Sequence, residues 1–193
     1  MPRAERKFQD DGIYHILNRG NGRQRVFQKD GDFLAFLKLL GQMKEQYGIV
    51  LYAYCLMPNH FHLLVKAAQG EELSPAMQWF LTTHVRRYHQ HYRTSGHLWQ
   101  GRFKSFEVSG DEYFLTVARY IEGNPLRAGL VDTAVDWVWS SHRGRCNLQQ
   151  DQLIEPLPVP WVGDWTHYVD TPLTPSELAK VRKKRQPTHR SIS

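Results

Sequence analysis

The chain has 193 residues, 41% of them hydrophobic, and a net charge of +6 with a pI near 9.4. This length allows a buried core without disulfides, and no apolar run reaches the roughly 20 residues of a membrane helix. The two cysteines, Cys55 and Cys146, lack the spacing of a metal site and are typical of a reducing compartment. We therefore expect a cytoplasmic protein with no membrane partner.

Basic residues occur in clusters along the sequence. The clusters are Arg19, Arg23 and Arg25 around a glycine-rich turn, Arg86 with Arg87, Arg102 with Lys104, and the run Arg182, Lys183, Lys184 and Arg185. Clustered positive charge attracts phosphates and releases counterions on binding, which favours nucleic acid as the partner. The alternative is a basic surface that is only solvated, and charge alone does not decide between the two.

The spacing of apolar residues predicts a regular series of elements. In chain order these are a strand over 13–19, a helix over 30–47, strands over 49–57 and 60–67, a helix over 73–92, a strand over 102–108 and a helix over 109–124. Their ends are set by the Gly20–Gly22 turn, Gly48, Pro58, Ser74 as a cap before Pro75, a capping box of Ser109 and Glu112, and Pro125.

This order is that of the split ferredoxin-like arrangement. We therefore expect an α+β fold with a βαββαβ core, in which an antiparallel sheet carries two helices on one face and a third helix follows. After Val131 the sequence is rich in tryptophan and proline and has little periodicity. Thr174, Pro175 and Glu177 then predict one more short helix that begins with a capping box.

His60 and His62 are two residues apart in the strand predicted over 60–67. Side chains alternate along a strand, so both imidazoles point to one face while Phe61 points to the other. Two nitrogens can bind a divalent ion and leave positions for a third ligand and a phosphate oxygen, as in a catalytic metal site. The alternative is a polar patch in which the histidines only form hydrogen bonds.

Tyr120 and Asn124 are four residues apart on the helix predicted over 109–124, so they share a face. This spacing places a candidate nucleophile beside an amide oxygen that could complete a metal site. A phenol is a weak nucleophile and needs a cation nearby. Tyr113 is the second candidate nucleophile. The alternative is that Tyr120 packs on the sheet and Asn124 is a turn residue ahead of Pro125.

Taken together, five segments resemble the HUH single-tyrosine transposases, in particular the REP-associated tyrosine transposases of the IS200-like branch. The segments are YHILNRGNGRQRVF (14–27), YCLMPNHFHLLV (54–65), LWQGRFKS (98–105), RYIEGNPLRAGLV (119–131) and DWVWSS (136–141). They cover most of residues 12–142. The pair MPNHFHLLV and YIEGNPLRAGLV is the specific part of the match, and Gly123 stands where the family has larger residues.

The resemblance implies DNA transposition, in which single-stranded, hairpin-forming DNA is cleaved and transferred through a 5′-phosphotyrosine. It implies that Tyr120 is the nucleophile and that His60, His62 and Asn124 bind the cofactor, Mg²⁺ or Mn²⁺. Residues 1–145 would form the catalytic domain and residues 146–193 a C-terminal extension with a basic tail. The protein would act as a monomer or a homodimer.

The remaining site residues are expected to bind the DNA. The basic clusters would contact phosphates, and Trp99 and Phe103 are candidate platforms on which unpaired bases stack. Other functions are a regulator that binds structured DNA without cutting it, a relaxase or replication initiator, and a metal-dependent RNA-processing enzyme. The regulator would bind without a metal, whereas relaxases are commonly longer and often carry a second tyrosine beside the nucleophile.

Overall fold

The computed structural model describes residues 7–183. In this part of the chain, four strands form one antiparallel sheet in the order β2-β3-β1-β4. The strands are β1 (Gly12–Arg19), β2 (Ile49–Met57), β3 (His60–Ala67) and β4 (Lys104–Glu107). Strands β1 and β3 are the central pair, so side chains on both of them can be covered from either face of the sheet.

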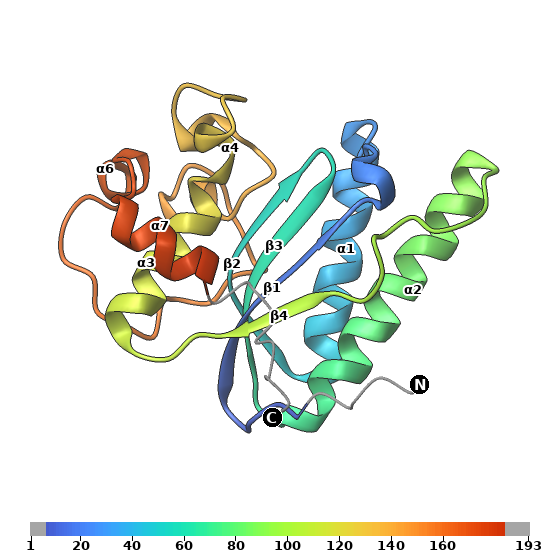
Figure 1. Cartoon of the computed structure of the whole chain (residues 1–193), viewed down its shortest axis with the longest axis horizontal. Coiled ribbons are helices and arrows are strands. Elements are labelled where there is room, and N and C mark those ends of the chain that lie inside the picture. Colours follow the sequence, from blue (N-terminus) through green and yellow to red (C-terminus); the bar gives the residue numbers. More distant parts are fainter. Residues whose placement is uncertain (1–6, 184–193) are drawn as a thin grey trace, which may run out of the picture.

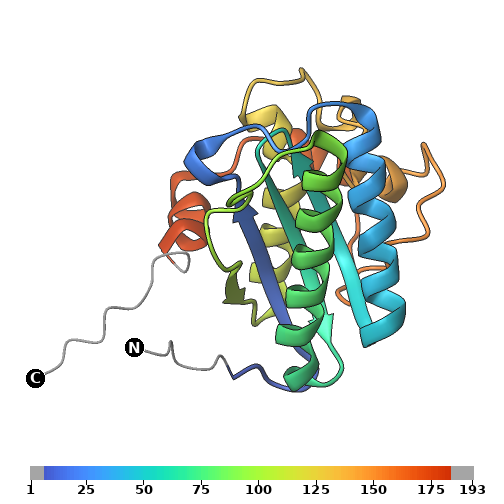
Figure 2. The same cartoon turned by 90° about the vertical axis from the view of Figure 1, so that its right-hand side faces the viewer.

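Helices cover both faces of this sheet. α1 (Asp30–Tyr47) and α2 (Leu73–Tyr92) lie side by side on one face, and α3 (Asp111–Glu122) lies on the other (Figure 1 and Figure 2). The shorter elements are α4 (Asn124–Arg127), α5 (His142–Arg145), α6 (Trp165–Asp170), α7 (Pro175–Lys183) and the 3-10 turns η1 (Asn21–Arg23), η2 (Gly70–Glu72) and η3 (Ala134–Asp136). The predicted ferredoxin-like α+β fold is confirmed.

The two faces of β3 contribute to two separate cores. Phe61, Leu63 and Val65 are fully buried and pack in the cluster formed with α1 and α2. Leu64 belongs to the second cluster, which α3 completes. Because side chains alternate along a strand, His62 lies on the same face of the sheet as Leu64.

The observed bounds of α1, α2, β2 and β3 agree with the prediction, whereas β4 and α3 are shorter than predicted. α3 ends at Glu122 because Pro125 has no N–H to donate to the carbonyl of Ile121. Two predicted N-terminal helix caps are wrong. α2 begins at Leu73, directly after η2, so Ser74 is not its cap. The N-cap of α3 is Gly110 (φ 86°), one residue too late for a capping box that begins at Ser109.

The C-terminal region packs against α3, on the face of the sheet opposite α1 and α2 (Figure 1). Trp165 and Val169 of α6 and Val181 of α7 are buried in the same cluster as α3. The sequence analysis did not predict α6, although the Asp164 side chain accepts hydrogen bonds from two backbone N–H groups at its start. The predicted capping box of α7 is confirmed by reciprocal bonds between Thr174 and Glu177.

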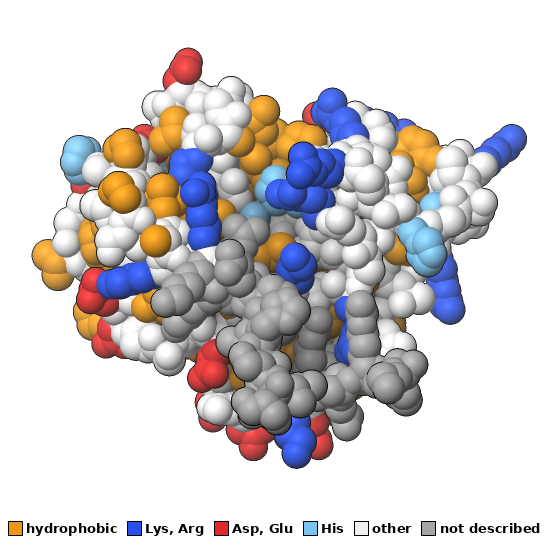
Figure 3. All heavy atoms as spheres, viewed as in Figure 1, with side chains coloured by type: hydrophobic (Ala, Val, Ile, Leu, Met, Phe, Trp, Pro, Cys, Tyr) orange, Lys and Arg blue, Asp and Glu red, His pale blue; other side chains and the backbone are white. Residues whose placement is uncertain are grey.

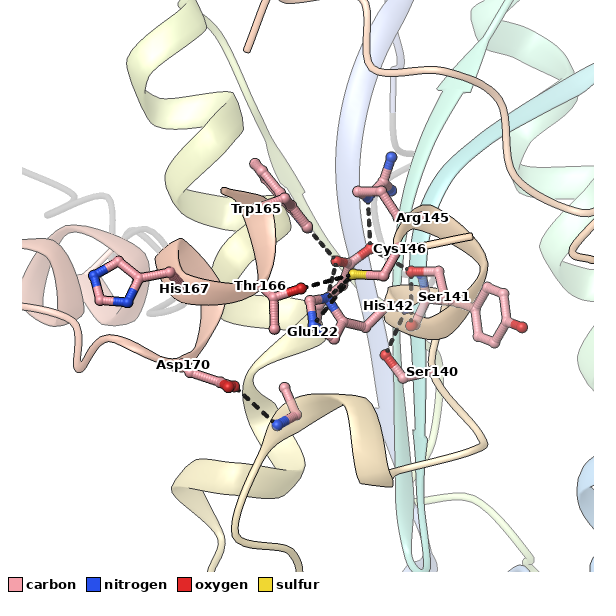
Figure 4. A network of polar contacts seen from close by, with 12 residues as sticks. Glu122, Ser140, Ser141, His142, Arg145, Cys146, Trp165, Thr166, His167 and Asp170 are labelled. Carbon is pink, nitrogen blue, oxygen red and sulfur yellow. Dashed lines mark hydrogen bonds and ion pairs between the residues drawn. The ribbon is translucent and has the colours of Figure 1, made fainter. Parts of the chain in front are cut away.

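A fully buried carboxylate, that of Glu122 at the end of α3, joins this region to α3 (Figure 4). It accepts hydrogen bonds from Ser141 Oγ (2.7 Å), His142 Nδ1 (3.0 Å), Arg145 Nε (2.9 Å) and Trp165 Nε1 (2.7 Å). Burial alone would raise the pKa of Glu122, but the charge of Arg145 and the hydrogen bonds from His142 and Ser141 lower that pKa to about 2. The end of α3 is thus held by side chains that come 19 to 43 residues later in the chain.

None of the described helices combines the length and the apolar composition that a membrane crossing requires.

We expect Glu122→Gln to lower the free energy of unfolding by about 3 kcal/mol, because it leaves the largely buried Arg145 without its counter-charge. Urea denaturation measures the change. The matched control is Glu155→Gln, which breaks a surface ion pair in which the glutamate side chain is 51% exposed, and it should cost less than about 1 kcal/mol. Equal stability of the two variants would contradict the structural role of Glu122.

The buried His84 makes stability depend on pH. Burial in α2 lowers the pKa of His84 from 6.5 to about 4. Between these values the unfolded chain binds a proton that the folded chain does not, so the free energy of unfolding should fall, by about 3 kcal/mol, as the pH drops from 6.5 to 4. His84→Gln should remove this part of the pH dependence in denaturant titrations. The exposed His167, changed to glutamine in the same way, should leave it intact.

Candidate active site

The two histidines of β3 lie at the end of the strand that follows the β2-β3 turn. Their ring centroids are 5.1 Å apart. His62 pairs with Leu17 of β1 and Cys55 of β2 and is 1% exposed, whereas His60 pairs with Arg19 and is partly exposed. One imidazole is therefore enclosed by the fold while the other borders the surface.

Hydrogen bonds orient both imidazoles. His60 Nδ1 lies 2.7 Å from Asn59 Oδ1, and His62 Nδ1 lies 2.9 Å from His15 Nε2. Metal-binding histidines commonly make such a bond with one ring nitrogen and bind the ion with the other. The structure places His15 against His62, buried and 1% exposed.

Tyr120 faces the histidines from α3, on the opposite side of the same core. Its ring centroid is 5.9 Å from that of His62 and 6.1 Å from that of His15, and the tyrosine is 8% exposed. Tyr113, the second candidate nucleophile, is partly buried and packs against the cluster under α3. The structure thus brings Tyr120 and the histidine pair together across 58 residues of sequence.

Arg127 is a residue of this site that the sequence analysis missed. Its guanidinium carbon lies 4.2 Å from the ring centroid of Tyr120, and its Nη2 donates a hydrogen bond to the Tyr120 backbone carbonyl. A cation over an aromatic ring is attracted by the negative face of the ring. The seven-residue spacing is the only signal in the sequence, and the break at Gly123 between α3 and α4 conceals it.

Asn124 is the first residue of α4 rather than part of α3, the helix that carries Tyr120. Its amide nitrogen is buried and has no hydrogen-bond partner among residues 7–183. No group of three or more His, Cys, Asp and Glu side chains in the described residues is arranged to hold a metal ion. A metal site here therefore needs a ligand of another kind, and an amide oxygen is one that divalent cations accept.

A positively charged pocket of about 310 Å³ opens beside His60. Its lining residues are Leu17, Asn18, Arg19, His60, Gln100, Arg102 and Lys104. Figure 3 shows lysine and arginine side chains gathered next to histidine in the middle of this face. The segment before β4 runs along β1 with Gln100 N donating to Arg19 O, and this pairing brings Arg102 and Lys104 to the histidines.

The other predicted DNA-binding residues are spread over several surfaces. Arg23 and Arg25 are exposed in the loop after β1, and Arg182 is exposed on α7. Arg86 and Arg87 line two different cavities on either side of α2. The Lys183 side chain, Lys184 and Arg185 lie outside the described residues.

Trp99 and Phe103 are not open platforms for base stacking, and that prediction is wrong. They are 6% and 4% exposed and belong to the core formed with α1 and α2. Gln100 and Lys104 line the pocket beside His60, whereas the rings of Trp99 and Phe103 pack in that core.

Comparison with known proteins gives consistent matches. Residues 9–124 match the family described as "Transposase IS200 like". Over 177 residues the chain is 27% identical to a Haemophilus influenzae protein classed as a REP-associated tyrosine transposase, covering 85% of this chain and 95% of that relative. A solved REP-associated tyrosine transposase bound to a REP hairpin is similar in fold, with a TM-score of 0.61 and 20% identity, over 85% of this chain and 93% of that one.

A solved protein from Deinococcus radiodurans, also classed as a transposase, has a TM-score of 0.44 and 23% identity and covers 63% of this chain and 96% of that one. The family match extends over more than half of the chain and contains both histidines and the tyrosine of the site. The chain therefore belongs to the IS200-like transposases, a family of enzymes.

Proposed function

We propose that this chain cleaves and rejoins single-stranded DNA beside a hairpin through a covalent bond between Tyr120 and a 5′-phosphate. The observation that carries the proposal is the position of the Tyr120 ring against His62 and His15. The relatives support the choice of substrate, because one is classed by its association with REP elements and another is bound to a REP hairpin.

The cationic pocket beside His60 provides a place for the phosphate. Arg19, Arg102 and Lys104 approach it from two neighbouring chain segments, so a phosphate there receives charge-assisted hydrogen bonds from more than one direction. Positioning and electrostatic stabilisation supply most of the catalysis in phosphoryl transfer. The pocket therefore serves both to bind the strand and to fix the phosphate for attack.

In the covalent step, the Tyr120 oxygen forms a bond to phosphorus as the bond from phosphorus to the 3′ oxygen of the preceding nucleotide breaks. The phenol gives up its proton, and the departing 3′ oxygen takes one up as it becomes a hydroxyl. Attack by a 3′-hydroxyl on the phosphotyrosine reverses the step and joins the strands. Arg127 holds the Tyr120 ring during both steps through its contact with the ring face.

We further propose that His60, His62 and Asn124 bind a divalent cation, Mg²⁺ or Mn²⁺. The residues suit this role, because hydrogen bonds to Asn59 and His15 orient the two imidazoles, and Asn124 carries an amide oxygen of the kind that divalent cations accept. When bound, the cation would withdraw charge from a phosphate oxygen.

We also propose that residues 1–145 form the catalytic domain and that residues 146–193 form an extension that supports it.

We expect Tyr120→Phe to abolish covalent attachment to a single-stranded hairpin oligonucleotide, because the nucleophilic oxygen is lost. Affinity for the DNA should stay within about twofold of the wild type, since the phosphate-binding residues are unchanged. A denaturing gel detects the adduct, and fluorescence anisotropy measures binding. Tyr113→Phe is the matched control from the same helix and should retain the adduct. An adduct in Tyr120→Phe, or its loss in Tyr113→Phe alone, would move the nucleophile to Tyr113.

Metal removal is a separate test. EDTA should abolish the adduct, and Mn²⁺ or Mg²⁺ should restore it. His15→Ala should weaken Mn²⁺ binding by about 10- to 100-fold, because His15 orients His62 without being a ligand itself. Isothermal calorimetry with Mn²⁺ measures this directly, and the exposed His167→Ala serves as control. Adduct formation that persists in EDTA would contradict the metal site while leaving Tyr120 as nucleophile.

A further inference from the structure

A second cavity, of about 660 Å³, is lined by residues of α2 and of the segment that leads from α2 to β4. Met77, Leu81 and Val85 are spaced at four-residue intervals along α2 and form one wall, and Leu98 and Phe103 form part of the other. Its volume lies within the range of about 300–1,000 Å³ that is usual for pockets that enclose small organic groups. The role assigned above to the histidines and Tyr120 makes no use of this cavity.

The rim of the cavity is positively charged. Arg86 from α2 and Arg102 from the opposite wall line it, and its described lining residues include no aspartate or glutamate. An apolar interior with two arginines at the rim suits a ligand that has a flat apolar body attached to a negative group. Guanidinium groups bind phosphates and also stack on bases. A nucleotide has both features.

Arg102 connects this cavity to the pocket beside His60, because it lines both. Neighbouring residues line the two spaces: Gln100 and Lys104 contribute to the His60 pocket, while Trp99 and Phe103 contribute to the second cavity. A strand whose phosphate lies beside His60 therefore meets the rim of the cavity next. Its base can enter only if it is unpaired, because a base in a duplex is held in the stack.

We propose that this cavity receives an unpaired nucleobase of the same DNA strand whose phosphate binds beside His60. This inference rests on the proposed function and adds a base-binding site to it. It also predicts a preference for single-stranded over duplex DNA, since a base held in a duplex stack cannot enter the cavity.

The test fills the cavity and removes the base. Val85→Trp places a large side chain on the α2 wall, and Thr82→Trp does the same from an exposed lining position that tolerates substitution more readily. The probe is a hairpin oligonucleotide with a single-stranded flank, used intact or with one abasic site at each flank position in turn. Fluorescence anisotropy measures its affinity for the full chain, and thermal unfolding checks that each variant is folded.

We expect one abasic position to weaken binding to the wild type by about tenfold, the order of loss for one base contact. Filling the cavity should weaken binding of the intact probe by a similar factor and abolish the effect of that abasic position. Leu34→Trp, at an exposed position of α1 away from the cavity, should bind both probes like the wild type. A fully paired duplex of the same sequence should bind the wild type and the filled variants equally.

The inference is overturned if both filled variants bind the intact probe as tightly as the wild type, or if they still lose affinity at the same abasic position. A second measurement, covalent adduct formation at a saturating concentration of probe, distinguishes failure of the base-binding inference from failure of the proposed function. The filled variants should form the adduct when the probe saturates them. A wild type that binds the probe with the expected abasic effect but forms no adduct would contradict the proposed function alone.

Discussion

Strand β3 is covered by helices on both faces, so each of its side chains must suit one of two different environments. Phe61, Leu63 and Val65 fill the core with α1 and α2, and this packing fixes the register of the strand. The alternate positions then face α3, which places His62 under Tyr120 and His60 at the surface end. A shift of one residue would turn both histidines toward the apolar core with α1 and α2 and would turn Phe61 toward α3. The geometry of the site therefore depends on hydrophobic packing on the other face of the sheet.

Much of this arrangement could be predicted from the sequence. The apolar periodicity of residues 30–92 is strong, and the elements it predicts agree with α1, β2, β3 and α2. The common face of the two histidines follows from the two-residue repeat of a strand. These features depend on local spacing, and local spacing is visible in a single sequence.

The remainder depends on contacts between distant segments. Arg127 reaches Tyr120 only because the chain breaks at Gly123 and starts a new helical turn, and no periodic pattern describes such a break. Trp99 and Phe103 look like surface aromatics in a basic segment, but pairing of that segment with β1 turns them into the core. The donors that bind the Glu122 carboxylate of α3 come from α5 and α6, so no short sequence motif contains the whole group. Sequence patterns predict which residues share a face, but not which distant face they meet.

The hydrogen bonds around Glu122 also affect the order in which parts of the protein can fold during its synthesis. Tyr120, both histidines and the residues that line the cationic pocket have all been made by residue 124, yet the hydrogen-bond donors to the buried carboxylate extend to Trp165. A nascent chain that ends before α6 has a charged group at the end of α3 without its full set of partners, which disfavours its burial. A chain of this length would thus carry Tyr120 on a helix whose end lacks its full set of hydrogen-bond donors. The final packing of α3 against the sheet therefore has to wait for the synthesis of α6, more than 40 residues later.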